Sequence, residues 1–267
     1  MFLYKLARKA NAQLKKYKKQ QNGKLLSPVR RIEFVHPPAQ GRYVAMTFDD
    51  GPSALPPSHS HGDRGLTDTL LDILKEYGAA GTFDVIGDTS QNYPDKPGNP
   101  GDFTWSGVHY DHYPQYEMDH LAGAINQPDL VRRILAEGHE ISNHGYTHRL
   151  FGPMRAVYGE RHHFQSLEEV VADLQKLHHY LEQDFGYTMK LSRPPHYIDN
   201  IPKGGSSYDA YRVMGYHYMA ASFDGDGWMP NPTYEEDVQK MIDPLRRALE
   251  EDINALNGKI IFHVAWY

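Results

Sequence analysis

Two adjacent aspartates, Asp49 and Asp50, end an apolar run at residues 42–48 and are followed by a Gly-Pro turn. Neighbouring carboxylates resist ionisation unless a cation lies close to them. His144 and His148 are spaced four residues apart in the segment SNHGYTH, so one helical turn would bring both rings to one face. Two histidines and one carboxylate with open positions suit catalytic zinc or another divalent ion, and the second carboxylate is then available as a base.

Three further polar clusters also stand where a strand is expected to end. They contain Arg193 in SRPPHY, Asp224 and Asp226 in FDGDGW, and His263 in IIFH. Active sites of parallel β/α architectures gather at the carboxyl ends of the strands. Each short motif is weak by itself, because a chain with 16 histidines contains accidental pairs. Five clusters at five expected strand ends together predict one active site.

Short apolar segments alternate with amphipathic ones from residue 42 onward, which predicts β/α units and a parallel sheet, open or closed as a barrel. Strands are expected at residues 42–48, 81–87, 139–142, 188–193, 216–223 and 258–263. Helices are expected at residues 66–78, 127–138, 166–186, 206–214 and 234–256. Two long polar insertions, at residues 88–126 and 149–165, interrupt this pattern, and the aromatic residues of the first favour a loop that faces a ligand.

Composition narrows the class of protein. The chain of 267 residues is 40% hydrophobic, which is enough for one large domain. It contains no cysteine, so any metal must be bound by His, Asp or Glu. No run approaches 18 consecutive apolar residues, so the sequence predicts no membrane span. Residues 1–32 hold ten of the 28 Lys and Arg residues and no acid, which leaves a strongly acidic body for which we expect no nucleic-acid partner.

The basic segment, residues 1–32, has an amphipathic pattern. Apolar residues recur in it at spacings of three and four, at Leu3, Leu6, Ala10, Leu14 and Tyr17. Such a helix can lie on an anionic membrane or wall surface, or pack on the end of the sheet. The segment lacks the continuous apolar run and the small-residue cleavage site of a secretory signal, so it does not indicate export. We therefore expect a basic segment at 1–32 and one catalytic domain at 33–267.

The five clusters together resemble a known family. TFDDGPS, NHGYTH, SRPP, FDGDGW and IIFH follow the order and approximate spacing of the five motifs of polysaccharide deacetylases, the NodB-like enzymes of carbohydrate esterase family 4. The similarity covers roughly residues 42–263. It implies an α/β fold with a distorted (β/α) barrel and metal-dependent removal of N-acetyl, sometimes O-acetyl, groups from polymer sugars. It also implies a cell-envelope or extracellular location.

The resemblance gives the two aspartates different roles. Asp50, His144 and His148 resemble the metal ligands, with zinc as the expected ion and cobalt, nickel or manganese as alternatives. Asp49 resembles the general base for a metal-activated water that attacks the acetyl carbonyl. Arg193 resembles the residue that pairs with this base.

The last two motifs carry the expected general acid. His263 resembles the group that protonates the leaving amine, and Asp226, or failing it Asp224, resembles its partner. Trp228 resembles an aromatic residue that lines the sugar-binding groove. Gly227 directly precedes this tryptophan, where the family usually has the carboxylate, so the sequence leaves the partner of His263 open.

The sequence departs from the family pattern at other positions. His196 stands where the third motif usually has Tyr or Phe, and Tyr197 follows one position later; both are expected to contact substrate, with a nearby backbone N–H stabilising the oxyanion. Asp84, where the family prefers an aromatic residue, has no role that the sequence reveals. Family members usually continue after the last motif with an Asp, a helix and a strand, whereas this sequence stops at Tyr267, so we expect a shortened chain that supports His263 poorly.

The predicted function is deacetylation of a polymer or oligomer that contains N-acetylglucosamine, either peptidoglycan or chitin-like. Two alternatives remain open: a hydrolase of small cyclic amides or imides on the same fold, and a non-catalytic sugar-binding envelope protein. A small closed pocket would favour the first alternative. Metal and sugar binding without turnover would favour the second.

Overall fold

The computed structural model describes residues 28–36, 41–54, 64–88, 104–105, 108–109, 120–156, 159–160, 162–225 and 233–264. Most of the basic segment, most of the 88–126 insertion, and the predicted site residues Asp226 and Trp228 lie outside these residues. The expected contact of the basic segment with a membrane or wall surface therefore stays a prediction. Within the described residues, no helix combines the length and the apolar character that crossing a membrane requires.

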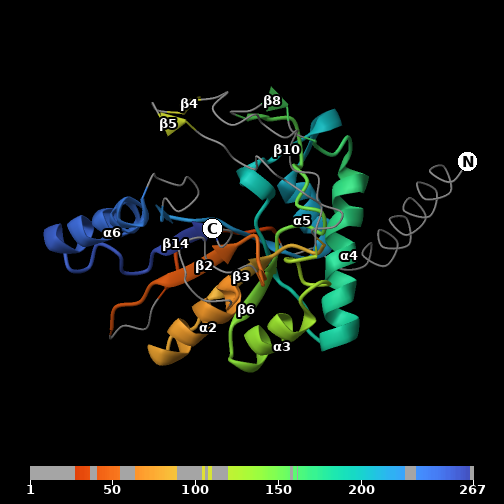
Figure 1. Ribbon diagram of the computed structural model, residues 1–267. Coiled ribbons are helices and arrows are strands. Elements are labelled where there is room, and N and C mark those ends of the chain that lie inside the picture. Colours follow the sequence, from red (N-terminus) through yellow and green to blue (C-terminus); the bar gives the residue numbers. More distant parts are fainter. Residues whose placement is uncertain are drawn as a thin grey trace, which may run out of the picture.

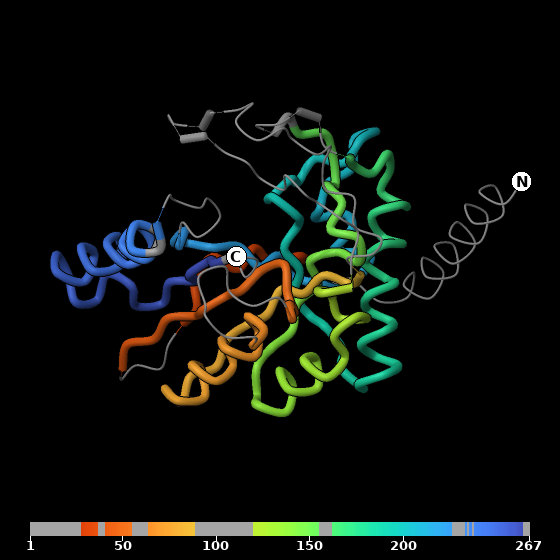
Figure 2. Tube along the Cα trace, viewed as in Figure 1, coloured from red at the N-terminus to blue at the C-terminus, as the bar shows by residue number. Residues whose placement is uncertain are grey.

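One curled sheet of eight parallel strands forms the centre of the molecule (Figure 1). In spatial order its strands are β1 (Arg31–Ile32), β12 (His217–Met219), β9 (Leu191–Ser192), β6 (Glu140–Asn143), β3 (Thr82–Val85), β2 (Ala45–Asp49), β14 (Ile260–Val264) and β13 (Phe223–Asp224). In the tube view, orange β2 and blue β14 run side by side although more than 200 residues separate them (Figure 2). The predicted α/β fold with a parallel sheet is confirmed.

A single segment brings the two ends of this sheet together. Residues 216–223 are predicted as one strand, but the structure divides the segment into β12 and β13. The first part pairs with β9 and the second with β14, and Ser222 between them donates its backbone N–H to Ile260. This one stretch of chain therefore supplies the last strand of the curled sheet, β13, and the strand next to its first, β12, as expected for the distorted barrel that the sequence predicts. The segment before residue 36 also contains an unpredicted strand, β1, which pairs with β12.

Among the described residues, five α-helices lie around the sheet: α2 (Leu66–Glu76), α3 (Pro128–Ala136), α4 (Leu167–Phe185), α5 (Ser207–Met214) and α6 (Tyr234–Glu251). Figure 1 shows α2 beside α3, α5 beside α4, and α6 at the opposite end of the molecule from α4. Ser166 caps α4 by accepting from the backbone N–H of Glu169, and Gly186 ends the helix in a left-handed conformation. The Glu169 carboxylate accepts from the backbone N–H of Gln165 rather than from that of Ser166, so only one of the two hydrogen bonds of a capping box forms.

Two short 3-10 helices, η2 (Pro195–Tyr197) and η3 (Pro202–Gly204), and three antiparallel strand pairs complete the described elements. The strand pairs are β4 (Thr104–Trp105) with β5 (Val108–His109), β7 (Arg155–Ala156) with β8 (Gly159–Glu160), and β10 (Asn200–Ile201) with β11 (Gly205–Ser206). The first two pairs fall within the predicted insertions. The insertions therefore contain local hairpins that do not join the central sheet.

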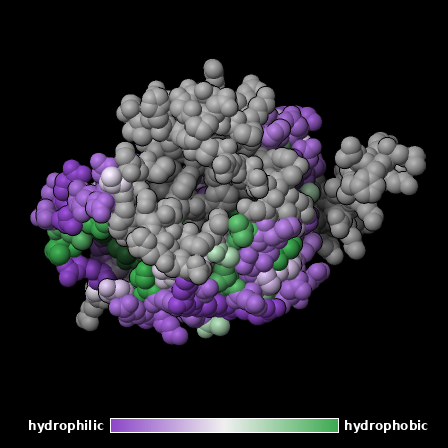
Figure 3. Space-filling model, viewed as in Figure 1, coloured by the Kyte–Doolittle hydropathy of each residue, from purple (hydrophilic) through white to green (hydrophobic). Residues whose placement is uncertain are grey.

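The hydrophobic core fills the space between the sheet and its helices. The strands contribute Phe48, Phe83 and Ile141, and the helices contribute Leu71, Val131, Ile134, Leu174 and Leu177. Over α2 and α3 the outer surface is mainly hydrophilic, with scattered apolar side chains (Figure 3). These helices thus bury one face against the sheet, which holds the strand ends in a fixed relation to one another.

Candidate active site

The register of three neighbouring strands sets polar side chains in a row. Asp49 in β2 is paired with Asp84 in β3, and Asp84 is paired with Ser142 in β6. Paired residues of adjacent strands point to the same face of a sheet. All three side chains are buried, and the Ser142 hydroxyl donates a hydrogen bond to the Asp84 carboxylate. The carboxyl edge of the sheet therefore contains a buried polar row.

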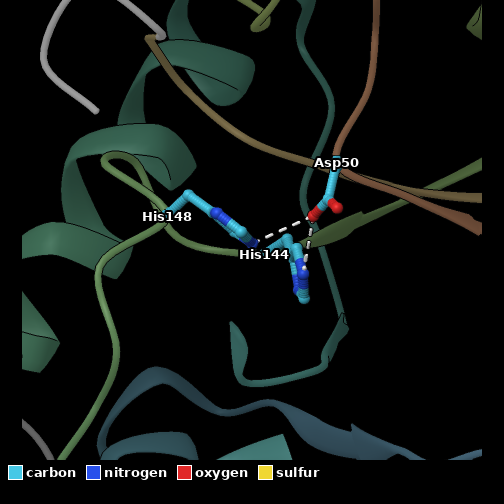
Figure 4. A group of neighbouring side chains, drawn as sticks. All are labelled: Asp50, His144 and His148. Carbon is cyan, nitrogen blue, oxygen red and sulfur yellow. Dashed lines mark ion pairs between the residues drawn. The ribbon is translucent and has the colours of Figure 1, made fainter. Parts of the chain in front are cut away.

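Asp50, His144 and His148 meet directly beyond this row (Figure 4). Oδ1 of Asp50 lies 3.1 Å from Nε2 of His144 and 3.0 Å from Nε2 of His148. The backbone of Asp50 and that of His148 have positive φ angles of 71° and 51°. Non-glycine residues rarely adopt such angles, which cluster at functional sites. The two histidines come together in an irregular loop, so the helical turn that the sequence predicts for them is wrong although their proximity is confirmed.

This group fits a divalent cation. Oδ1 of Asp50 is buried, yet no described residue directs a hydrogen bond at it, although both imidazole nitrogens are close. The three candidate ligand atoms lie within 4.8 Å of one another, as ligands around a common centre do. Imidazole nitrogen and carboxylate oxygen are ligands that zinc accepts in open catalytic sites. Burial acts to raise the pKa of Asp50, but His148 and His144 outweigh it and hold this pKa well below its usual range.

Asp49 is buried against Arg193. The Arg193 guanidinium is 0% exposed and its Nη1 lies 2.5 Å from Oδ1 of Asp49. Nη1 also donates to the Thr47 hydroxyl at 3.0 Å, and Nε donates to the Met219 carbonyl at 3.1 Å. Burial raises the pKa of Asp49 to about 7, although Arg193 and His144 act to lower it. A carboxylate with a pKa near neutrality is well matched to proton transfer.

His263 in β14 lies at the same edge of the sheet, next to β2. Its ring is buried and stacks on Phe48, with ring centroids 6.1 Å apart. No described residue forms a hydrogen bond with its Nδ1, which is buried. Burial lowers the pKa of His263, whereas the charge of Asp224 raises it. A Cβ on Gly225 would come within 2.4 Å of Nδ1, so only glycine leaves room for the ring there.

His196 and Tyr197 lie in the turn after β9, and both have positive φ angles. His196 is exposed, and its ring centroid is 5.7 Å from that of His148. The ring of Tyr197 packs against the Arg193 guanidinium at 5.4 Å. The structure thus brings His196 beside His148, and Tyr197 beside the arginine that pairs with Asp49.

Comparisons with known proteins decide the family. The family model described as polysaccharide deacetylase matches residues 36–201, more than half of the chain. The chain belongs to the polysaccharide deacetylase family. The resemblance predicted from the sequence motifs is thereby confirmed.

Curated relatives in this family include two deacetylases. The chain is 30% identical over 107 residues to a chitooligosaccharide deacetylase of Bradyrhizobium sp., covering 40% of this chain and 29% of the relative. It is 27% identical over 153 residues to a peptidoglycan-N-acetylglucosamine deacetylase of Bacillus cereus, covering 57% of this chain and 36% of the relative. The chain thus spans about a third of the length of these relatives.

A solved structure supports the fold of the family. The chitin deacetylase of Colletotrichum lindemuthianum superposes with a TM-score of 0.58 at 22% identity, covering 90% of this chain and 79% of that one. The family model covers the Asp49–Asp50 pair, the two histidines and Arg193, but it ends before Asp224 and His263. The assignment of those last two residues therefore depends on their geometry.

Two buried carboxylates contact this site, and sequence reasoning gave no role to the first, Asp84, and did not single out the second, Asp173. Asp84 lies 2.8 Å from Nδ1 of His144. Asp173 of α4 accepts the backbone N–H groups of Tyr146 and Thr147 and the Thr147 hydroxyl, and so fixes the loop between the two histidines. The sequence did contain a signal for both residues: an acidic residue inside an apolar strand or on the buried face of a helix. Such a carboxylate is buried only when it has a partner, so its position indicates a specific contact.

Replacing Arg193 with methionine should destabilise the protein by about 3–5 kcal/mol, because it leaves the Asp49 carboxylate buried without its cation. Urea unfolding of the metal-free protein measures this loss. The double variant Asp49→Asn with Arg193→Met should lose less than Arg193→Met alone, since no buried charge is then uncompensated. If Arg193→Met lowered the free energy of unfolding by less than about 1 kcal/mol, as is typical of exposed ion pairs, the result would contradict a buried ion pair.

Proposed function

We propose that this chain is a metal-dependent hydrolase that removes N-acetyl groups from a polymer or oligomer of N-acetylglucosamine, peptidoglycan or chitin-like. The observation that carries the proposal is that the two adjacent aspartates have different partners. Asp50 belongs to the group formed with His144 and His148, whereas Asp49 is buried against Arg193 beside that group. Such a pair separates metal binding from proton transfer.

The charges of the site support a divalent cation. Asp49, Asp50 and Asp84 bring three carboxylates together, and Arg193 compensates one of them directly. A cation with two positive charges between Asp50 and the two imidazoles would offset the other two. When bound, such an ion would polarise the acetyl carbonyl and lower the pKa of a water molecule. Zinc is the proposed ion, because the ligand set contains two imidazoles and one carboxylate.

Asp49 acts as the general base in this proposal. Its Oδ1 is held by Arg193, while its Oδ2 lies 3.7 Å from Nε2 of His144 and therefore faces the metal group. Oδ2 takes a proton from the water that attacks the acetyl carbon. Arg193 orients the carboxylate, so the proton acceptor does not need to reorganise during the reaction.

His263 acts as the general acid. When the C–N bond breaks, its imidazolium gives a proton to the leaving nitrogen, so that the products are acetate and a free amine on the sugar. Phe48 packs on the ring, burial lowers the pKa of His263, and the charge of Asp224 offsets part of that lowering. Asp226 is the proposed partner of Nδ1, and its position outside the described residues leaves this role a prediction.

The sugar chain is proposed to bind at the exposed side of the site. His196 contributes an exposed ring beside His148, and Tyr197 contributes a ring that packs on the Arg193 guanidinium. Trp228 is the proposed aromatic platform of the groove. The names of the Bradyrhizobium and Bacillus cereus relatives support N-acetylglucosamine oligomers and peptidoglycan as the substrate class.

Acetate release from a substrate panel tests the proposed function. The panel comprises N-acetylglucosamine oligomers of increasing length, peptidoglycan, acetylated xylan and a small cyclic imide, each with zinc-loaded and chelator-treated protein. We expect zinc-dependent release from the N-acetylglucosamine substrates at a rate that rises with oligomer length. Turnover of the imide alone would support the alternative hydrolase, and sugar binding by folded, zinc-loaded protein without any release would support a binding protein.

A further inference from the structure

Asp84 is a fully buried carboxylate that the proposed reaction does not use. It lies in β3, where the surrounding strand is apolar, and its side chain is 0% exposed. Its Oδ1 accepts the Ser142 hydroxyl across the β3–β6 pair. Its Oδ2 has no aligned hydrogen-bond donor among the described residues, although it lies 2.8 Å from Nδ1 of His144. Burying a charge in this way is costly unless the charge compensates a partner.

Two acceptors surround the same edge of the His144 ring. Nδ1 donates to the Arg193 carbonyl at 2.8 Å, and the Asp84 carboxylate stands at the same distance from Nδ1. An unprotonated Nδ1 would place its lone pair against two oxygens and be repelled by both. The proton therefore stays on Nδ1, and Nε2, which faces Asp50, is the ring nitrogen that remains available to a cation.

We infer that Asp84 is a positioning residue, whose buried carboxylate beside Nδ1 of His144 holds that ring in the tautomer and orientation that presents Nε2 to a divalent cation. The carbonyl of Arg193 alone would favour the same tautomer, and the negative charge of Asp84 adds electron density to the ring. Carboxylates in contact with metal-binding imidazoles raise ligand basicity, and their loss typically weakens metal affinity by about 10- to 100-fold. The inference depends on the proposed metal group but not on the substrate.

Zinc affinity tests the inference without any measurement of deacetylation. Asp84→Asn should weaken zinc binding by about 10- to 100-fold in competition with a chromophoric chelator. The metal-free variant should be at least as stable to urea as the parent, because one of three neighbouring carboxylates is neutralised. Asp88→Asn is the matched control: Asp88 is also buried just beyond β3, but it bonds to Asn126 and Tyr146 and should leave zinc affinity unchanged.

A double-mutant cycle separates action through His144 from a long-range charge effect. In the His144→Ala background the remaining zinc affinity comes from Asp50 and His148, and adding Asp84→Asn should leave it unchanged. An undiminished effect in that background would show that the carboxylate acts by its charge alone and would overturn the inference.

Comparison with other single variants gives two further outcomes that would overturn it. Equal losses of zinc affinity in Asp84→Asn and Asp88→Asn would show that both losses come from disturbed packing. A loss as large as that of Asp50→Asn would make Asp84 a ligand instead. If the zinc affinities of the four proteins changed as predicted but the protein released no acetate from any substrate, only the proposed function would be refuted.

Discussion

Asp49→Asn should lower kcat for acetate release by about 10²- to 10⁴-fold while zinc remains bound at the parental stoichiometry. The substitution keeps the shape of the side chain and an oxygen that Arg193 can reach, but it removes the group that accepts a proton. Oδ2 of Asp49 lies 3.7 Å from Nε2 of His144, so this oxygen is the proton acceptor that the substitution removes beside the metal group. Steady-state kinetics at saturating substrate and metal analysis of the same sample provide the measurement.

Asp72→Asn is the control for this substitution. Asp72 is a half-exposed carboxylate in α2 that pairs with Arg133 and Arg64. Its loss should leave turnover unchanged and cost little stability, as for other exposed ion pairs. If Asp49→Asn retained full activity with zinc bound, Asp49 would not be the base, and another proton acceptor would have to be sought.

Substitution of the neighbouring residue, Asp50→Asn, should instead weaken zinc binding. Removing this carboxylate oxygen takes one ligand and one negative charge from the metal group, so we expect zinc affinity to fall by more than about 100-fold, beyond the usual loss of an indirect partner. Asn tolerates the positive φ of 71° at this position, so the backbone can keep its conformation. Chelator competition measures the affinity.

The two adjacent substitutions control each other. Excess zinc should restore part of the turnover of Asp50→Asn, because occupancy limits that variant, whereas it should not restore Asp49→Asn, because chemistry limits that one. Identical responses of both variants to zinc would contradict the division of labour between the two aspartates. Urea unfolding of both metal-free proteins excludes a general loss of structure as the cause.

The chemistry of the site could be predicted from local sequence. These groups all lie at or just beyond the carboxyl end of an apolar strand, and parallel strands bring such ends to one edge. They are the paired aspartates, the spaced histidines, Arg193 and His263. Strand periodicity and glycine or polar boundaries are local properties, so most strands and helices were predicted within a few residues. The same local character explains the errors. The spacing of His144 and His148 suggested a helical turn, because spacing alone does not reveal that Asp173 holds their loop in an irregular form.

The sequence by itself determined which groups are present, in which order, and that they stand at strand ends. Only the tertiary structure decided which of them touch. The pairing register sets Asp49, Asp84 and Ser142 in one row, and a shift of one residue would have turned those side chains to the other face. The division of residues 216–223 between β9 and β14 likewise depends on contacts between distant strands. Such contacts involve residues tens to hundreds of positions apart, and no local pattern encodes them.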